Sequence, residues 1–305
     1  MHLTVLMPFH TPFYAPVAAG AALGHFAREG LEVEVRAAAA YGKPAVAALL
    51  DGDLVITASG LMRSFDLADR GGPILVHFAE LCQRNGFFLL ARRPMPAFRW
   101  TDVAGRTVLG FAEAPTPWLC LLSVLRRHGV DPAGVRIERE RPGPEAIAAF
   151  RAGHGDFLEQ TQPVIEQLVD EGVGHVVAAM GDATGLLPFT SYMTTPAFLE
   201  KERGAVAAFT RAVYRTQRWL VDRAPAEIAS ALSTTFPEVP AERLIRAVAR
   251  YTAQDTWSRD PLIRRAGYDH LQQVLLDGSF IRVPQPYERL VDTAIAEAVM
   301  REPLT

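Results

Sequence analysis

The chain has 305 residues, 49% of them hydrophobic, and a formal net charge of −3. This composition is that of a globular protein, and the length suits two α/β lobes better than one compact domain. The weak charge, without a basic cluster interleaved with aromatic residues, argues against a nucleic-acid partner. The only cysteines, Cys82 and Cys120, lie far apart and outside any CxxC pair, so neither a disulfide framework nor a zinc site is predicted.

Membrane and export signals are absent from the sequence as it stands. No apolar run approaches the roughly 20 residues that a membrane-spanning helix requires, because Arg, Asp or Gly interrupts each one. The first predicted strand begins within three residues of Met1, which leaves no room for a signal peptide. We therefore expect a periplasmic location if a signal peptide has been trimmed, and a cytoplasmic location if Met1 is the native start.

Two loops of similar design follow predicted strands in the two halves of the chain. The strand-like run 4–8 stops at the loop 9–14, and the run 107–111 stops before the loop 113–118; a helix begins at each loop. In open α/β sheets, ligands lie beyond the carboxyl ends of strands, near helix N-termini. The repetition predicts one ligand held between two lobes.

The first part of the chain alternates strands and helices up to a proline-rich break. Pro94 and Pro96 resist both a helix and a central strand, so we place a lobe boundary there. A buried strand at 54–56 ends on the small-residue loop 57–60, a third candidate ligand-facing segment. The other elements predicted here are a helix at 16–29, a strand at 31–36, a short helix at 44–51, and strands at 74–79 and 87–91.

After the break the alternation restarts and then gives way to helices. The predicted strands are 107–111, 135–138, 156–159 and 175–178, with helices at 117–128, 144–152 and 162–171 between them. The run 186–192 is expected to cross back to the first lobe, and the pattern is helical from Pro196 onward. We divide the chain into the first part of lobe 1 (1–92), lobe 2 (93–188), and a return to lobe 1 with C-terminal helices (189–305).

Common catalytic and cofactor motifs are missing. The chain has no GxGxxG after a strand, no P-loop, no GxSxG, no HExxH and no calcium loop. Its eight histidines are scattered without metal-ligand spacing. We therefore expect neither a cofactor nor a metal.

Candidate ligand contacts are the polar and aromatic side chains of the predicted cleft loops. His10 either contacts the ligand or merely belongs to a hydrophobic staple at the helix start. Glu80, Glu113 and Glu159 each follow a strand at the same predicted edge, opposed only by Arg84. They favour a ligand with donors or positive charge, although solvated loop carboxylates are the alternative. The aromatic side chains that suit a flat ring are Phe13, Tyr14, Trp118, Phe189 and Tyr192.

Short motifs spread along nearly the whole chain carry a family resemblance. They are residues 11–16 with Gly24 and 29–33, then 53–55, 102–108, 155–157 with Pro163, and 257–261. In order and spacing they resemble the SsuA and thiamine-pyrimidine-synthase-like superfamily of solute-binding proteins, which serve ABC importers of sulfonates, taurine, nitrate and thiamine precursors. The resemblance implies a type II periplasmic-binding-protein fold: two α/β lobes, two crossover strands and a helical C-terminal tail. With the residues above, it implies these ligand contacts: His10, Thr11, Phe13, Tyr14, Thr57, Ser59, Glu80, Glu113, Thr116, Trp118, Glu159, Phe189 and Tyr192.

Two functions from different classes fit this resemblance. The first is capture of a small, flat, nitrogen-bearing solute, such as a thiamine-pyrimidine precursor, by closing lobes that hand it to an ABC permease. The second is a cytoplasmic enzyme on the same fold, acting on a small heterocyclic or aromatic substrate with His10 or a cleft carboxylate as base. A sulfinate desulfinase of this fold uses a cysteine in the first loop, where this chain has His10; Cys82 is the thiol expected nearest the cleft.

Overall fold

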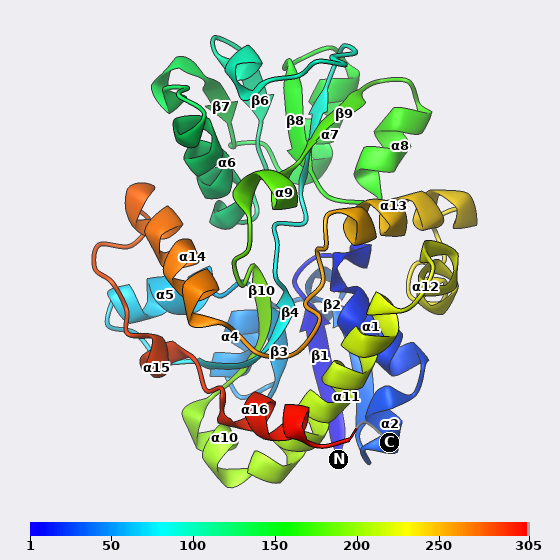
Figure 1. Ribbon diagram of the computed structural model, residues 1–305, viewed down its shortest axis with the longest axis vertical. Coiled ribbons are helices and arrows are strands. Elements are labelled where there is room, and N and C mark those ends of the chain that lie inside the picture. The colour runs from blue at the N-terminus through cyan, green and yellow to red at the C-terminus, as the bar shows by residue number, and fades with distance from the viewer. Residues whose placement is uncertain (304–305) are drawn as a thin grey trace.

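The chain folds into two α/β lobes that lie one above the other along the long axis of the molecule (Figure 1). The computed structural model describes residues 1–303. Lobe 1 is the lower lobe in Figure 1 and begins with the N-terminal strand; lobe 2 is the upper one. None of the helices within residues 1–303 combines the length and the apolar character needed to span a bilayer.

Lobe 1 contains two small sheets that lie beside each other. Strands β1 (His2–Met7) and β2 (Glu32–Ala37) pair in parallel. Strand β10 (Thr190–Thr194) lies antiparallel between β3 (Thr57–Ser59) and β4 (Val76–Cys82), and β1 packs next to β3. The helical elements of this part are η1 (Pro12–Tyr14), α1 (Ala15–Ala22), α2 (His25–Arg28), α3 (Ala38–Tyr41), α4 (Ala45–Leu50) and α5 (Met62–Asp69).

The single helix predicted at 16–29 is two helices, α1 and α2. Gly24 separates them, because its φ of +70° lies in the left-handed region, where only glycine is free of strain. Helix α1 is buried along most of its length, since α11 packs against it. The alanine-rich composition of α1 therefore serves close helix packing.

Lobe 2 is built on one five-stranded sheet with the order β7-β6-β8-β5-β9. The sheet is mixed: β6 pairs in parallel with β7 and β8, whereas β5 runs antiparallel to β8 and β9. Its strands are β5 (Phe88–Ala91), β6 (Thr107–Leu109), β7 (Arg136–Glu138), β8 (Phe157–Gln160) and β9 (His175–Ala179). Its helical elements are η2 (Trp100–Val103), α6 (Pro115–Arg127), η3 (Pro132–Gly134), α7 (Gly143–Arg151), α8 (Val164–Asp170) and α9 (Met180–Thr184).

The chain crosses between the lobes twice. Strand β5, predicted as the last strand of lobe 1, pairs with β8 and β9 in lobe 2. The first crossing therefore lies at 83–87, some residues before the boundary predicted after residue 92. The second crossing runs from β9 through α9 to β10. The predicted architecture, two α/β lobes with two crossings and a helical tail, is confirmed.

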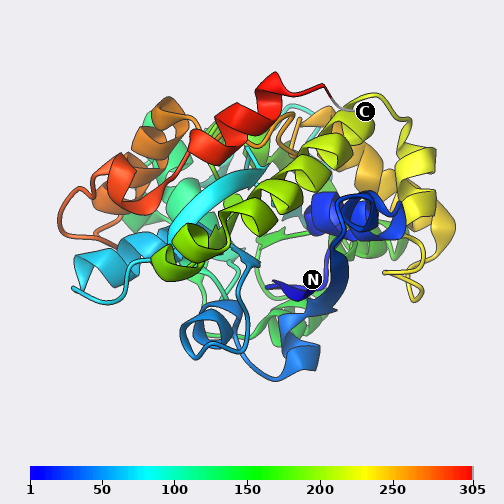
Figure 2. The same ribbon diagram turned by 90° about the horizontal axis from the view of Figure 1, so that it is seen from below.

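The C-terminal helices contact both lobes. Helices α11 and α16 lie side by side across lobe 1 (Figure 2). Helix α13 packs against α8 of lobe 2, and α14 contacts α5 of lobe 1 and α6 of lobe 2. The helical pattern expected from Pro196 onward is interrupted between α15 and α16, where Val291 forms a β-bridge to His77. The tail helices are α10 (Pro196–Lys201), α11 (Arg203–Val221), α12 (Pro225–Leu232), α13 (Ala241–Ala253), α14 (Arg265–Asp277), α15 (Tyr287–Leu290) and α16 (Ala294–Arg301).

Candidate ligand-binding cleft

Two adjoining hollows lie between the lobes. The inner one, of about 40 Å³, is enclosed by the loop after β1, the start of α5, the start of α6, and both crossings. The outer one, of about 520 Å³, lies between helices α3 and α4 of lobe 1 and Glu113 of lobe 2. The residues that line both hollows, and so join them, are Pro8, Phe9, Ser59 and Arg63.

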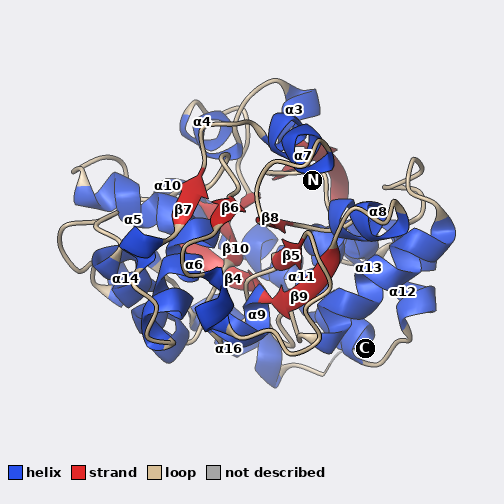
Figure 3. Cartoon of the chain, turned by 90° about the horizontal axis from the view of Figure 1, so that it is seen from above, coloured by secondary structure: helices blue, strands red, loops and turns tan. Residues whose placement is uncertain are grey.

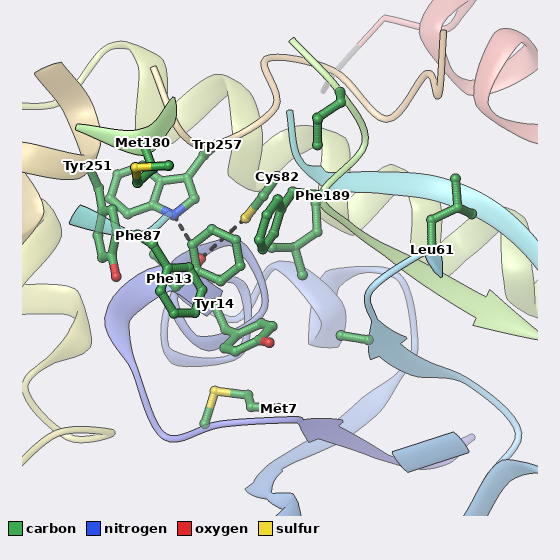
Figure 4. Packing of buried hydrophobic residues seen from close by; sticks show 14 of the residues in the cluster. Met7, Phe13, Tyr14, Leu61, Cys82, Phe87, Met180, Phe189, Tyr251 and Trp257 are labelled. Carbon is green, nitrogen blue, oxygen red and sulfur yellow. Dashed lines mark hydrogen bonds between the residues drawn. The ribbon is translucent and has the colours of Figure 1, made fainter. Parts of the chain in front are cut away.

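The loop after β1 is fixed in place by hydrogen bonds from several elements. The Thr11 side chain accepts from the Phe13 N–H at 3.3 Å and caps η1, which begins at a proline. The Phe13 carbonyl accepts from the Trp257 indole N–H at 2.9 Å and from the Cys82 thiol at 3.4 Å. Figure 4 shows the Phe13 carbonyl held between these two donors. The ring of Phe13 is therefore presented to the cleft on a rigid backbone.

Aromatic rings from lobe 1 and from both crossings line the inner hollow, and Figure 4 shows how four of them, Phe13, Tyr14, Phe87 and Phe189, pack together. The Phe13 ring packs edge-on against Tyr14, with ring centroids 5.2 Å apart, and against Phe189 at 5.8 Å. Phe87 of the first crossing lies 6.2 Å from Phe189 of the second. Such a surface binds a flat ring through stacking and edge-to-face contacts.

Arg63, in the first turn of α5, is a cation that lines both hollows. Its Nη2 donates to the Glu113 carbonyl oxygen at 3.3 Å, across the two lobes. No carboxylate within residues 1–303 forms an ion pair with it. Loss of hydration lowers the pKa of the guanidinium from its ordinary value. An anionic group in the cleft would thus meet an arginine without a competing carboxylate partner.

The other charged groups of the hollow are already engaged. Lys43 forms ion pairs of 2.6 Å with both Asp51 and Asp53, and these pairs raise its pKa. The Glu113 carboxylate accepts from the Gly143 N–H at 2.6 Å, at the start of α7, where the helix dipole favours a negative charge. Arg63 is therefore the cation in the cleft most available to a ligand.

The structure brings about half of the predicted contact residues to the hollows. Those that line them are Thr11, Phe13, Tyr14, Ser59, Glu113, Thr116 and Phe189. Those that it places elsewhere are His10, Thr57, Glu80, Trp118, Glu159 and Tyr192.

His10 and Trp118 take part in contacts outside the hollows. The His10 side chain lies on an exposed part of lobe 1, with Nε2 2.9 Å from Glu238 Oε1 and its ring centroid 4.6 Å from that of Phe236. The guanidinium carbon of Arg139 lies over the Trp118 ring, 3.8 Å from the ring centroid. His10 lies in the loop after β1 and Trp118 in the first turn of α6, but neither residue lines the hollows.

The other four residues are buried within the lobes. The Glu80 carboxylate accepts from the Ser258 hydroxyl at 2.9 Å, and burial raises its pKa to about 8. Burial also raises the pKa of Glu159 to about 8; neither of its carboxylate oxygens has a hydrogen-bond partner within residues 1–303. Burial therefore favours the neutral form of both carboxyl groups. Thr57 and Tyr192 lie inside lobe 1: the Thr57 hydroxyl donates to the Leu6 carbonyl at 3.4 Å, and Tyr192 packs against Phe209.

Two of the groups considered for catalysis, Cys82 and His10, lack a geometry suited to that role. Cys82 is fully buried, donates to the Phe13 carbonyl, and has a pKa raised by burial. A thiol of this kind is inert, because the thiolate is the nucleophile. His10 lies outside both hollows. Among residues 1–303, no three His, Cys, Asp or Glu side chains come close enough to share a metal ion.

Two α/β lobes, joined by two crossings and enclosing a hollow lined from both sides, define the type II fold of solute-binding proteins. The chain belongs to the NMT1-like family, whose model matches residues 9–234. The resemblance to SsuA-like solute-binding proteins, predicted from the sequence, is confirmed in the fold, because solved SsuA structures superpose on nearly the whole chain.

One curated protein and two solved structures illustrate what the chain is similar to. The candidate binding protein YtlA of Bacillus subtilis (strain 168) is 28% identical over 295 residues, which cover 96% of this chain and 88% of YtlA. The alkanesulfonate-binding protein SsuA of Xanthomonas axonopodis pv. citri, bound to MOPS, superposes with a TM-score of 0.71 at 15% identity, over 98% and 97% of the two chains. The desulfurization enzyme DSZB, in complex with biphenyl-2-sulfinic acid, has a TM-score of 0.68 at 15% identity, over 98% and 99%. At these identities the two solved structures bear on the fold alone.

Proposed function

We propose that the protein is the solute-binding component of an ABC importer and that its ligand is a small flat molecule carrying an acidic group. The observation that carries the proposal is the position of Arg63, which faces the hollow without a carboxylate partner and next to a surface of aromatic rings. Charge-assisted hydrogen bonds from a guanidinium to a carboxylate or sulfonate are among the strongest available to such a site.

The charge of the cleft changes the ligand expected from the sequence. A donor-rich, nitrogen-bearing solute was expected because three carboxylates were predicted at one edge. Two of them, Glu80 and Glu159, are buried away from the hollow, and Glu113 remains. A nitrogen-bearing ring stays compatible with Glu113, but Arg63 adds the requirement of an acidic substituent. A neutral or cationic thiamine-pyrimidine precursor fits this pair of charges less well.

The proposed mechanism is closure of the lobes on the ligand. Contacts from Phe13 and Arg63 in lobe 1 and from Thr116 in lobe 2 can be made together only when the lobes adjoin, so binding shifts the population toward the closed form. The closed form would then deliver the ligand to an ABC permease outside the cytoplasm. No bond is made or broken in this role.

A thermal-shift and calorimetry panel tests the proposal. Benzoate and benzenesulfonate are compared with benzamide, benzylamine and an aminopyrimidine, and a ligand at 100 times its Kd should add about 2.7 kcal/mol of stability. We expect the acids alone to stabilise the protein, and Arg63→Met to weaken their binding by at least about tenfold. Arg28→Met, which removes an exposed arginine of α2, is the matched control. Preferential binding of the amine or the pyrimidine would overturn the acidic-ligand proposal. Conversion of a bound ligand, detected by mass spectrometry, would overturn the transport role.

A further inference from the structure

The pole of lobe 2 farthest from the cleft carries a separate hollow of about 620 Å³. It lies where β6 and β8 begin and β5 ends, so it occupies the edge of the sheet opposite to the one that faces lobe 1. Figure 3 views the molecule from this pole. No residue that lines this hollow also lines the ligand cleft.

Positive charge is concentrated in this hollow. Four arginines line it, against the two aspartates Asp102 and Asp156. The chain as a whole has a net charge of −3, so this excess is local. A concave surface with an excess of one sign of charge attracts ions of the opposite sign.

Both aspartates are partly engaged by neighbouring groups. Asp156 accepts from the Thr107 N–H at 2.9 Å and forms a loose 3.5 Å pair with Arg106. Asp102 accepts from the Arg99 N–H at 2.8 Å. The carboxylates therefore neutralise the arginines of the hollow only in part.

Arg106 is the arginine paired with Asp156, and the other three arginines play two different parts. Arg92 is held rigidly: its Nε donates to the Gly155 carbonyl at 2.9 Å, its Nη2 donates to the His154 carbonyl at 2.7 Å, and its guanidinium lies 4.2 Å from the Phe150 ring centroid. Arg93 and Arg136 are exposed, and their side chains have no hydrogen bond or ion pair with any group in residues 1–303. Two free guanidinium groups thus border a hollow with a fixed third one in its wall.

We propose that this hollow binds the phosphate group of a phosphorylated ligand, with Arg93 and Arg136 as its direct contacts. An excess of two positive charges matches a dianion better than a monoanion, and the planar fork of arginine suits paired phosphate oxygens. The hollow is larger than a phosphate ion, so the ligand bears further atoms. The same chemistry is offered by a free phosphate ester and by an anionic lipid headgroup. The proposal is independent of the ligand in the interlobe cleft.

Titration with inorganic pyrophosphate at low ionic strength tests the phosphate chemistry directly. A parallel arm measures cosedimentation with vesicles that contain phosphatidic acid, whose headgroup is a phosphomonoester, and, as the neutral reference, with vesicles of phosphatidylcholine. The test variant is Arg93→Gln with Arg136→Gln. The control is Arg28→Gln with Arg126→Gln, which removes two exposed arginines outside the hollow. Melting temperatures establish that both double variants are folded.

We expect pyrophosphate or the anionic vesicles to bind, and the test variant to bind at least about tenfold more weakly. The control and Arg63→Met should stay within about twofold of the unmodified protein, and binding should weaken as salt rises. Binding of pyrophosphate would identify the ligand as a soluble phosphate compound. Binding of the anionic vesicles alone would identify it as a lipid headgroup. If neither probe binds, or if both double variants lose binding equally, the hollow is not a phosphate site. Failure of the Arg63 experiment would leave this result unaffected.

Discussion

The Thr11 hydroxyl donates a hydrogen bond of 2.6 Å to the carbonyl of Gln162 and so ties the first loop of lobe 1 to the segment that follows β8 in lobe 2. The Tyr251 hydroxyl of α13 accepts from the Gln162 N–H at 3.1 Å and lies 3.3 Å from Thr11 Oγ1. All three residues are buried. Because Thr11 and Gln162 belong to different lobes, this hydrogen bond stabilises only those conformations in which the lobes adjoin.

Replacing Thr11 tests the contribution of this bond to closure. Thr11→Val keeps the shape of the side chain but removes the hydroxyl, and a net hydrogen bond contributes about 1 kcal/mol. We expect the apparent Kd of a cleft ligand to rise roughly fivefold, because the binding-competent closed form becomes less populated. Thr11→Ser retains the hydroxyl and should bind within about twofold of the unmodified protein by calorimetry. Equal affinities for the valine and serine variants would contradict the role.

A second link between the lobes is an ion-pair network from α13 to α8. Glu166, of which the side chain is only 2% exposed, pairs with Arg246 at 3.0 Å and with Arg250. Asp170, one turn further along α8, pairs with Arg243 at 2.9 Å. Helix α13 packs against α12 and η1 of lobe 1, so these pairs connect the two lobes beside the cleft.

Glu166→Gln should loosen this link. We expect an apparent ligand affinity weaker by about threefold to tenfold, together with a larger radius of gyration of the ligand-free protein in X-ray scattering. The matched control is Glu171→Gln, because Glu171 pairs with Arg151, at 2.7 Å, inside lobe 2. If the two variants change the affinity and the radius equally, the network does not act on closure.

The aromatic side of the hollow depends on a glycine in the first crossing. A Cβ on Gly86 would lie 2.2 Å from Phe13 Cδ2, far inside van der Waals contact. Gly86→Ala should displace the Phe13 ring, lower the free energy of unfolding by about 1–3 kcal/mol, and weaken ligand binding. In Gly204→Ala the new Cβ has nothing within 4 Å, so stability should stay the same or rise by up to about 1 kcal/mol. Denaturant titrations of both variants measure the difference.

The sequence predicted the fold well because the alternation of strands and helices is a local pattern. The order of the strands is not local. Strand β5 was assigned to lobe 1 because it precedes the proline-rich break at Pro94 and Pro96, yet its hydrogen-bond partners, β8 and β9, come some 70 residues or more later. The boundary between the lobes was therefore placed a few residues too late.

The cleft was predicted less completely because a side chain's direction at a strand end depends on register. Glu159 and Thr161 both lie at the carboxyl end of the strand predicted at 156–159, where ligand contacts were expected. The Glu159 side chain is buried, whereas Thr161 lines the hollow. Arg63 was missed because it lies just inside α5, beyond the small-residue loop at 57–60 that was identified as ligand-facing. The signal that could have found it was a cation in the first turn of the helix after such a loop.

The buried Glu159 gives the stability of the protein a pH dependence that a single substitution should change. Burial raises the pKa of this carboxyl from 4.5 to about 8 in the folded chain. The folded state therefore keeps a proton that the unfolded state releases above pH 4.5, so stability is lost as pH rises from there through about 8. Glutamine carries no such proton, so Glu159→Gln should lack this loss.

We expect Glu159→Gln to be more stable than the unmodified protein at pH 8 by on the order of 4 kcal/mol, and about equally stable near pH 4.5. The pKa of Glu80 is also raised to about 8. Its contribution to the pH dependence of the free energy of unfolding is the same in both proteins, so it cancels in the comparison. Glu200→Gln, at an exposed position of α10, is the control and should follow the unmodified protein at every pH. Urea titrations between pH 4.5 and 9 measure these differences. A stability difference that stays constant with pH would show that Glu159 is charged in the folded state. Since Glu159 lies outside the hollows, ligand affinity at pH 7 should stay within about twofold, and a larger loss would place this carboxyl in the ligand site after all.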